Sequence, residues 1–238
     1  MLKFVGKGSA FNTALGNNGA YIKKDNALFL IDCGSVTFDR LKEKGILDDV
    51  EEITVLLTHT HPDRVGSLGD LIFYSYYSMG DMGVPKITIY APKDLYIDKL
   101  LQMMGVENEL YYLHEMNDIS THIRVLSIKM IVEPVRVQHV KELNCYGYVI
   151  SYEDETAYYS GDSNDIPRHI LKWHNEGEFD YFYQDTSGLD YEGNVHLSFN
   201  KLEGLITVFR QRVYCMHLDP AFDEQAALDV GFNVVQSI

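Results

Sequence analysis

The chain alternates between short apolar runs and longer segments in which apolar positions recur at helical spacing. Runs rich in β-branched and aromatic residues predict strands, and in the first half these fall at residues 2–6, 18–23, 27–32, 52–57 and 86–92. A helix is predicted to follow Arg64 as far as about residue 78. A second helix should open at Pro92 and run to about residue 104, because proline is favoured in the first turn of a helix.

The second half of the chain predicts a similar mixture. The β-branched content of 122–139 indicates two strands, and 146–153 with 156–161 predicts a hairpin around a polar turn. The remaining elements alternate between helix and strand, in the order helix 166–175, strand 179–185, helix 198–210, strand 213–218 and helix 223–230. Because strands lead and helices follow in each half, we expect one α/β domain over residues 1–238, with two packed sheets and helices outside.

One strand-like run ends in three side chains that can bind a metal ion. The run 52–57 leads into Thr-His-Thr-His-Pro-Asp, which places His59, His61 and Asp63 two residues apart. On an extended segment alternate side chains project to the same side, so we expect these three groups to converge. Imidazole nitrogens and carboxylate oxygens together suit a zinc-type cation.

The same feature recurs at four further apolar runs, which end in Asp32, His139, Asp162 and His217. Taken singly, each of these could be a polar turn residue at the end of a strand, and the His-x-His pair could belong to a solvated loop. Their recurrence at five run ends favours a metal-binding enzyme over that simpler interpretation.

The composition indicates which partners the protein can bind and in which cellular compartment we expect it. A formal net charge of −15 would repel the phosphate backbone of long RNA or DNA, whereas a small anion could still bind metal ions in a closed pocket. Cys33, Cys145 and Cys215 are scattered in apolar runs and are expected to be buried free thiols in a reducing compartment. The chain shows no signal peptide and no run of membrane-spanning length, so we expect a cytoplasmic protein without membrane contact.

Six short motifs, taken in order, resemble those of the metallo-β-lactamase fold superfamily. They are Gly-Ser-Ala at 8–10, Leu-Ile-Asp-Cys-Gly at 30–34, Thr-His-Thr-His-Pro-Asp at 58–63, Gln-His at 138–139, Ser-Gly-Asp-Ser at 160–163 and Met-His-Leu at 216–218. The resemblance covers nearly the whole chain. It implies an αββα sandwich, in which two mixed β-sheets pack between outer helices, and a hydrolase with two Zn²⁺ ions or, alternatively, Mn²⁺.

The resemblance also implies two sets of metal ligands. One set comprises His59, His61 and His139, and the other comprises Asp63, Asp162 and His217. Asp162 would bridge both ions. Asp32 would support the metal-bearing loop without binding a metal itself, as carboxylates beside histidine ligands often do.

One position departs from the superfamily pattern. Most members carry a histidine directly after the motif aspartate, and here that residue is Arg64. Arginine stays protonated and offers no lone pair, so it cannot bind a metal. The second site is therefore one ligand short of the phosphodiesterase pattern, although superfamily members that hydrolyse β-lactams tolerate arginine here.

A histidine followed two residues later by serine, shortly before the last predicted ligand, resembles the motif of transfer-RNA maturation endonucleases and related phosphodiesterases. The matching residues are His196 and Ser198. In this interpretation Asp185 orients His196, which protonates a leaving oxygen or holds a phosphate oxygen, and Asp63 is a further catalytic residue. In the simpler interpretation His196 lies in a loop and Ser198 only caps the following helix.

The maturation endonucleases carry a long RNA-gripping arm, but here only a short stretch lies between His139 and Asp162. A narrower resemblance rests on the start of the chain at 4–22, Phe-Val-Gly-Lys-Gly-Ser-Ala-Phe-Asn and onward, and on the tyrosine-rich segment 74–83. Through these segments the chain resembles the phage anti-Pycsar cyclic-nucleotide phosphodiesterases. This resemblance implies a homodimer that hydrolyses small cyclic mononucleotides to nucleoside monophosphates and so removes a host immune signal. Tyr74, Tyr76 and Tyr77 could stack on the base, although tyrosines at helical spacing more often pack in a core or an interface.

Other interpretations remain open. A β-lactamase, an RNA phosphodiesterase or a glyoxalase-type thioesterase would use similar metal chemistry. The missing signal peptide disfavours the first, and the His196 motif disfavours the thioesterase. From a different class, Arg64 could mark a metal-poor protein that binds a nucleotide and sequesters it without cleaving it.

Overall fold

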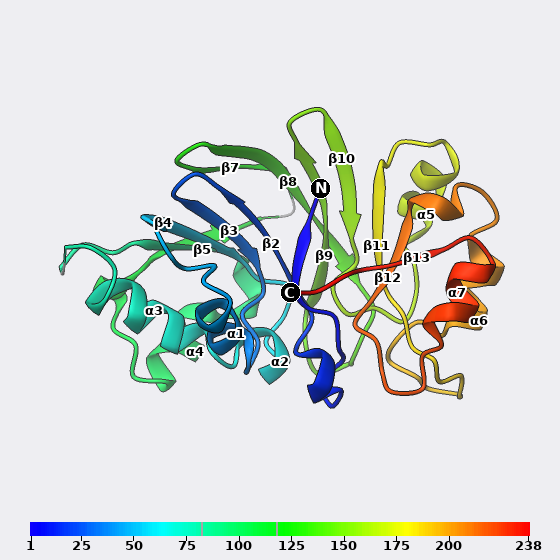
Figure 1. Ribbon diagram of the computed structural model, residues 1–238, viewed down its shortest axis with the longest axis horizontal. Helices are drawn as coiled ribbons and strands as arrows, with labels where there is room; N and C mark the ends of the chain where they lie inside the picture. Colours follow the sequence, from blue (N-terminus) through cyan, green and yellow to red (C-terminus); the bar gives the residue numbers. More distant parts are fainter. Residues whose placement is uncertain (82, 118) are drawn as a thin grey trace.

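The structure is a computed structural model that describes residues 1–81, 83–117 and 119–238. Two mixed β-sheets lie face to face, and helices cover the outer side of each, as the sequence predicts (Figure 1). The order of strands is β1-β2-β3-β4-β5-β6 in the first sheet and β13-β12-β11-β10-β9-β8-β7 in the second. The two ends of the chain meet near the middle of the molecule, where Phe4 pairs with Ser237.

The first sheet is formed by the first half of the chain. Its strands are β1 (Lys3–Gly6), β2 (Gly19–Lys24), β3 (Ala27–Ile31), β4 (Glu52–Leu56), β5 (Ile87–Pro92) and β6 (Tyr112–Met116). β1 to β3 are antiparallel, whereas β3 to β6 run parallel. The helices of this half are α1 (Thr37–Glu43), α2 (Pro62–Val65), α3 (Leu68–Tyr77) and α4 (Ile97–Met103).

The second sheet is antiparallel at one end and parallel at the other. Its strands are β7 (Thr121–Val125), β8 (Ile128–Val137), β9 (Cys145–Tyr152), β10 (Glu155–Tyr159), β11 (Tyr181–Asp185), β12 (Val213–Met216) and β13 (Asn233–Val234). β7 to β10 are antiparallel and β10 to β13 are parallel. The helices that follow are α5 (Arg168–Asn175), α6 (Phe199–Leu205) and α7 (Glu224–Asp229).

Several elements differ from the sequence prediction. α1, β6 and β13 were not predicted, and the helix predicted at 198–210 already ends at Leu205, because Ile206 is extended (φ −97°, ψ 100°). The helix expected from Pro92 is broken by Tyr96, whose left-handed φ of 51° separates a short 3-10 turn from α4. The helix expected after Arg64 is divided into α2 and α3, and α2 begins earlier, at Pro62.

Two apolar clusters hold these layers together. The larger one joins residues of both sheets and of the helices α1, α3 and α4, and it includes Phe29 of β3 and Tyr148 of β9, both fully buried. The other lies between the second sheet and its helices, where Phe182 of β11 packs with Ile170 of α5 and Leu202 of α6. Because both faces of the second sheet are packed, the ends of its strands are held in fixed positions.

The three cysteines are buried and free, which confirms the sequence prediction. Among the residues that the structure describes, no helix has the length and apolar character needed to cross a lipid bilayer.

Replacing Leu30 by alanine tests the larger apolar cluster. Leu30 is fully buried in β3, so the cavity left behind should lower the free energy of unfolding by about 2–5 kcal/mol. Leu228→Ala on α7 is the matched control, because Leu228 is 47% exposed and its loss should cost less than about 0.5 kcal/mol. Urea unfolding followed by circular dichroism measures both, and equal losses would contradict this core.

Candidate metal centre

The predicted ligands lie at the carboxyl ends of neighbouring strands. β10, β11 and β12 run parallel, so Asp162, Asp185 and His217 emerge at one edge of the second sheet. β3 and β4 also run parallel and place Asp32 and His59 at an edge of the first sheet. The two edges meet, since His59 lies within ion-pair distance of Asp162. Open α/β sheets commonly bind ligands beyond the carboxyl ends of their strands.

Four groups form the first candidate metal site: His59, His61, His139 and Asp162. His61 Nδ1 lies 3.0 Å from His59 Nε2 and 3.3 Å from His139 Nε2. Asp162 Oδ2 lies 3.5 Å from His59 Nε2 and 3.8 Å from His139 Nε2. Tetrahedral ligands at the usual zinc–nitrogen distance of about 2.0–2.1 Å would lie roughly 3.3 Å from one another. The observed spacings therefore fit a tetrahedral divalent cation.

The hydrogen bonds of the histidines direct lone pairs into this site. His139 Nδ1 donates to a backbone carbonyl oxygen at 2.9 Å, which assigns the lone pair to Nε2. Thr58 Oγ1 donates to Asp32, so His59 Nδ1 donates to that hydroxyl and Nε2 again carries the lone pair. Burial also lowers the pKa of His59 to about 3, which keeps the ring neutral. The donor set of the first site is therefore suited to a divalent cation.

Asp63 does not join this site, contrary to the expectation for an extended segment. The chain turns at Pro62 into α2, and Asp63 then faces His217, whose Nε2 lies 3.3 Å from Asp63 Oδ2. This placement agrees better with the ligand sets implied by the superfamily resemblance. A second group of metal-capable side chains lies close by, and it comprises Asp162, His196 and His217.

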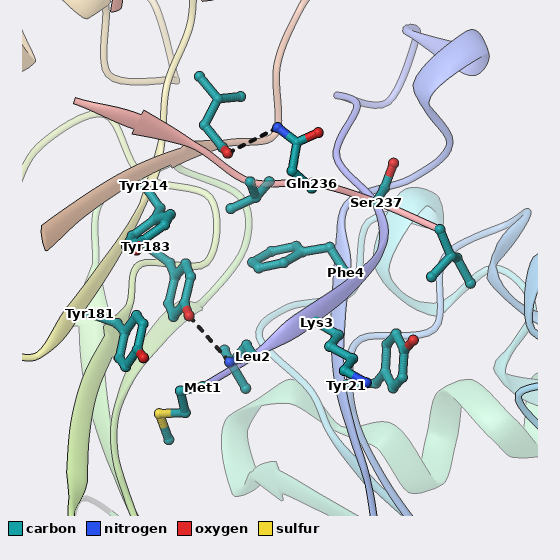
Figure 2. A pocket seen from close by; sticks show the side chains of 13 residues that line it. Met1, Leu2, Lys3, Phe4, Tyr21, Tyr181, Tyr183, Tyr214, Gln236 and Ser237 are labelled. Atoms are coloured by element: carbon teal, nitrogen blue, oxygen red, sulfur yellow. Dashed lines mark hydrogen bonds between the residues drawn. The ribbon is translucent and has the colours of Figure 1, made fainter. Parts of the chain in front are cut away.

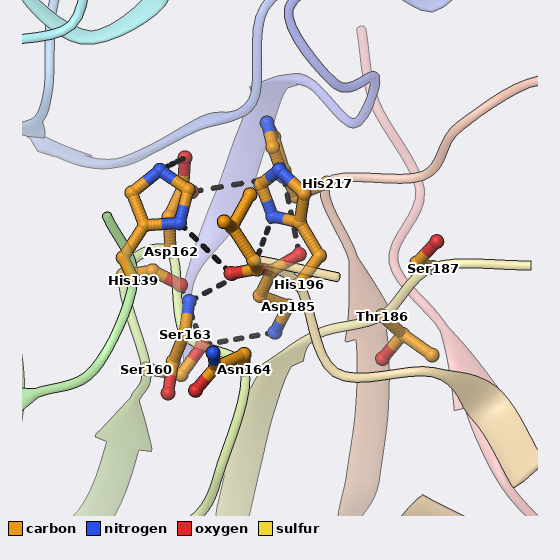
Figure 3. A network of polar contacts seen from close by, with 12 residues as sticks. His139, Ser160, Asp162, Ser163, Asn164, Asp185, Thr186, Ser187, His196 and His217 are labelled. Atoms are coloured by element: carbon orange, nitrogen blue, oxygen red, sulfur yellow. Dashed lines mark hydrogen bonds and ion pairs between the residues drawn. The ribbon is translucent and has the colours of Figure 1, made fainter. Parts of the chain in front are cut away.

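His196 and Asp185 form a hydrogen-bonded pair beside these groups (Figure 3). His196 Nδ1 lies 2.7 Å from Asp185 Oδ2, and Asp185 Oδ1 lies 3.1 Å from His217 Nδ1. Burial alone would lower the pKa of His196, but the Asp185 carboxylate raises it above its ordinary value. Burial would also lower the pKa of His217, yet Asp162 and Asp185 raise it to about 10. His217 must therefore lose a proton before it can bind a metal.

The guanidinium of Arg64 lies among the carboxylates of the second predicted site. Arg64 is fully buried, and its Nη2 contacts Asp162 Oδ1. Its Nε lies 3.6 Å from Asp63 Oδ2, and its Nη1 lies 3.8 Å from Asp32 Oδ2. Burial alone would raise the pKa of Asp162, but Arg64 holds it well below the ordinary value. A second divalent cation therefore fits less well than the first, because an arginine already neutralises these carboxylates.

Residues outside the donor groups hold them in place. Asp32 accepts hydrogen bonds of 2.8 Å from the backbone N–H and the hydroxyl of Thr58, directly before His59, which agrees with its expected supporting role. Burial raises the pKa of Asp32 to about 7. Gly161 precedes Asp162 with a left-handed φ of 60°, and a Cβ there would clash with a neighbouring backbone carbonyl, so this approach requires glycine.

Ser198 follows the simpler of its two interpretations. Its hydroxyl accepts a hydrogen bond of 3.4 Å from the backbone N–H of Lys201 and caps the N-terminus of α6. The loop before it is fixed to the second sheet, because Leu197 N–H donates to the carbonyl oxygen of Ser163 at 2.9 Å.

A cavity of about 410 Å³ opens onto both groups of donors. Its lining contains both polar and apolar side chains. The polar ones include His61, Asp63, His139, Asp162, His196 and His217, and the apolar ones Ala10, Phe11, Val36, Pro62, Val140 and Val195. The volume falls within the range of about 300–1,000 Å³ that is typical of small-molecule sites.

Phe11 is the aromatic residue at this cavity, and the sequence analysis did not identify it. Its side chain is 93% exposed. Phe11 directly follows the Gly-Ser-Ala motif at 8–10, and this position next to a superfamily motif is the signal that could have identified it. Tyr74, Tyr76 and Tyr77 lie on α3 and are absent from the described lining of this cavity, which agrees with the packing role that is more common for tyrosines at helical spacing. Tyr74 packs against Phe38 of α1 instead.

A second cavity, of about 400 Å³, lies where the chain ends meet β11 and β12 (Figure 2). Tyr181, Tyr183 and Tyr214 line it, and the hydroxyl of Tyr183 accepts a hydrogen bond of 3.2 Å from the N–H of Leu2. Its described lining includes no histidine, aspartate or glutamate side chain.

Solved structures of similar shape identify the fold. A diphosphatase from the PhnP family has a TM-score of 0.76 at 17% identity, and the match covers 99% of this chain and 94% of that one. For YhfI from Bacillus subtilis, a metallo-β-lactamase fold protein, the TM-score is 0.73 at 16% identity, with 99% and 96% covered. For the short form of human tRNase Z it is 0.68 at 17% identity, with 92% and 93% covered. The protein therefore has the metallo-β-lactamase fold, as predicted.

Within this class, the chain belongs to the Anti-Pycsar protein Apyc1 family, whose model matches residues 1–237. A relative named Anti-Pycsar protein Apyc1 from Paenibacillus xerothermodurans is 25% identical over 234 residues, covering 94% of this chain and 89% of its own. A protein of the same name from Bacillus phage 010DV004 is 27% identical over 237 residues, with 91% and 88% covered. The predicted family is confirmed.

Replacing Asp185 by asparagine tests the electrostatic link to His196. In metal-free protein we expect the pKa of His196 to fall from above 6.5 to below it, because the amide removes the charge that offsets burial. The imidazole resonances, followed by NMR across a pH titration, measure this change. Asp190→Asn, at an exposed aspartate nearby, should leave the pKa of His196 unaltered. An unchanged pKa in Asp185→Asn would contradict the pairing.

Proposed function

We propose that the protein is a metal-dependent phosphodiesterase that hydrolyses small cyclic nucleotides to nucleoside monophosphates. The observation that carries this proposal is the convergence of three imidazoles and a carboxylate at a cavity that His196 also lines. Membership of the Anti-Pycsar protein Apyc1 family supports a cyclic nucleotide as the substrate, since the family name refers to counter-defence against cyclic-nucleotide signalling.

The groups that would hold the ion are His59, His61, His139 and Asp162. We propose zinc, with manganese as the alternative, because a tetrahedral set rich in imidazole suits zinc. When bound, the ion supplies a nucleophile from water at neutral pH and neutralises charge on the phosphate. The predicted second ion, on Asp63, Asp162 and His217, stays a prediction that the position of Arg64 weakens.

His196 is placed to act as the general acid. Its bond from Nδ1 to Asp185 leaves Nε2 for a second partner, and its side chain lines the cavity. The Asp185 carboxylate raises the pKa of His196, which favours the protonated ring, and that proton would pass to the ribose oxygen as the phosphorus–oxygen bond breaks. Burial would raise the pKa of Asp185, but His196 and His217 lower it, so the carboxylate stays ionised and stabilises the imidazolium. Asp63 lines the same cavity and stays a predicted catalytic residue.

The cavity supports a small substrate rather than a long nucleic acid. Its volume of about 410 Å³ suits a mononucleotide, and the exposed ring of Phe11 offers a flat apolar face for a base. The net charge of −15 acts against a long phosphate backbone, whose binding requires many cations on the protein surface.

The same proposal extends to how the protein works in the cell. We place it in the cytoplasm, as one domain of 238 residues and as a homodimer that removes an immune signal; relatives from Bacillus phages support the counter-defence role. Exposed hydrophobic side chains, among them Tyr77, Met103 and Tyr112, are available for contact between copies. Light scattering that gives a single 27.2 kDa chain would contradict the homodimer.

A different activity on the same fold is the main alternative. The structural neighbours include a diphosphatase and a tRNase Z, although at 17% identity they show only the fold. Assays with nitrocefin, a glutathione thioester and short RNA, run beside cyclic nucleotides, separate these hydrolases. A metal-poor binder would retain a cyclic nucleotide in equilibrium dialysis without forming product.

His61→Ala is expected to reduce cyclic-nucleotide hydrolysis by at least about 100-fold, because loss of a direct ligand should cost no less than loss of a supporting residue. The assay is chromatographic detection of nucleoside monophosphate from cyclic CMP, UMP, AMP and GMP. His122→Ala removes an exposed imidazole from β7 and should keep wild-type turnover. Turnover that survives His61→Ala would overturn the proposed site.

Phe11→Ala tests the stacking surface. We expect KM for the cyclic nucleotide to rise by roughly 5- to 160-fold, since stacking of a base on an aromatic ring contributes about 1–3 kcal/mol. Phe11→Tyr keeps the ring and should retain the wild-type KM. If alanine and tyrosine give the same KM as phenylalanine, the base does not bind at Phe11.

A further inference from the structure

Arg64 occupies the place from which the superfamily pattern supplies a ligand to the second ion. Its guanidinium is fully buried, and carboxylates of Asp32, Asp63 and Asp162 all lie within 4 Å of it. Its Nη1 also donates a hydrogen bond of 2.6 Å to the backbone carbonyl oxygen of Asn18. The group is thus surrounded by acceptors drawn from four separate segments of the chain.

Because these side chains are buried, Arg64 and the surrounding aspartates each depend on the charge of the other. An arginine side chain keeps its charge, and a buried charge is tolerated only when opposite charges and hydrogen bonds compensate its loss of hydration. The reverse also holds, because Asp63 and Asp162 would repel each other strongly if no cation lay between them. In a two-metal site the second ion provides that positive charge, whereas here Arg64 provides it.

The two carboxylate oxygens of Asp162 face different partners. Oδ2 faces the first site, 3.5 Å from His59 Nε2 and 3.8 Å from His139 Nε2. Oδ1 contacts Arg64 Nη2 instead of facing an open position. A carboxylate can bridge two ions by giving one oxygen to each, and the contact with Arg64 occupies the oxygen of Asp162 that would face the second ion.

Asp63 is engaged in the same way. Its Oδ2 lies 3.6 Å from Arg64 Nε and 3.3 Å from His217 Nε2. Both carboxylates that the superfamily pattern assigns to the second ion are therefore directed at a permanent cation of the protein itself.

We propose that this protein binds one divalent cation, in the site of His59, His61, His139 and Asp162, and that Arg64 takes the electrostatic place of the second. A guanidinium has no lone pair and cannot activate water, so all metal chemistry belongs to the first site. Arg64 is absent from the lining of the cavity and acts as a positioning residue: it fixes Asp162 toward the ion and Asp63 toward His217.

The number of metal ions bound per chain tests this proposal independently of activity. The proposal itself rests on the first metal site of the proposed function. Wild-type protein saturated with zinc and then dialysed should contain one ion per chain by plasma mass spectrometry. Titration of the metal-free protein with Zn²⁺ should give a single tight site by calorimetry. Two tight ions in the wild type would overturn the proposal, and no bound ion would overturn it together with the proposed function.

Arg64→His restores the superfamily pattern and should add a second ion per chain, whereas Arg64→Lys keeps the charge and should remain at one. With Mn²⁺, the wild type should give the electron paramagnetic resonance spectrum of an isolated ion and Arg64→His that of a spin-coupled pair. If Arg64→His does not fold, the wild-type count and spectrum still decide. One ion without turnover of any cyclic nucleotide would overturn the proposed function and leave this inference standing.

Discussion

The structure depends on the balance of buried charges at the place where the carboxyl ends of strands from both sheets meet. Asp32, Asp63, Asp162 and Asp185 are all buried there, and buried carboxylates are stable only beside positive groups or hydrogen-bond donors. The guanidinium of Arg64 and the imidazoles of the site supply part of that compensation. A divalent cation at the first group of histidines would supply the rest. The apolar cores on both sides of the second sheet keep these charged groups from separating.

The site has two parts, which are the first candidate metal site and the hydrogen-bonded pair of His196 and Asp185. His59, His61 and His139 gather ring nitrogens at the first candidate metal site, while His196 is hydrogen-bonded to Asp185. Asp162 connects the two parts, because it contacts the first site, Arg64 and His217. A change in any one of these groups should therefore be felt by the others, as expected in a low-dielectric polar network.

Much of the site was predictable because its residues follow apolar strands. The signals for these ligands were strand ends. His59, Asp162 and His217 follow strands that have parallel neighbours and so share an edge, whereas His139 follows β8, an antiparallel strand of the second sheet. The position of Asp63 was mispredicted from spacing alone, because Pro62 starts a helix and ends the extended geometry. The family resemblance placed Asp63 better, since it carries information on the folded site that residue spacing lacks.

The remaining differences also have physical causes. β6 is largely exposed and β13 has only two residues, so neither produces a long apolar run. Phe11 is a single aromatic residue in a loop and has no periodicity to reveal it. The surroundings of Arg64 come from segments far apart in the sequence, and only the folded chain shows that this cation lies where a second ion was expected.

The most direct test of the central claim is anomalous X-ray diffraction at the zinc absorption edge, from crystals grown with zinc. The account predicts a strong anomalous peak between the nitrogens of His59, His61 and His139 and Oδ2 of Asp162, with the Arg64 guanidinium still against Oδ1. Density without any peak among these four groups, or imidazoles turned away from one another, would contradict it.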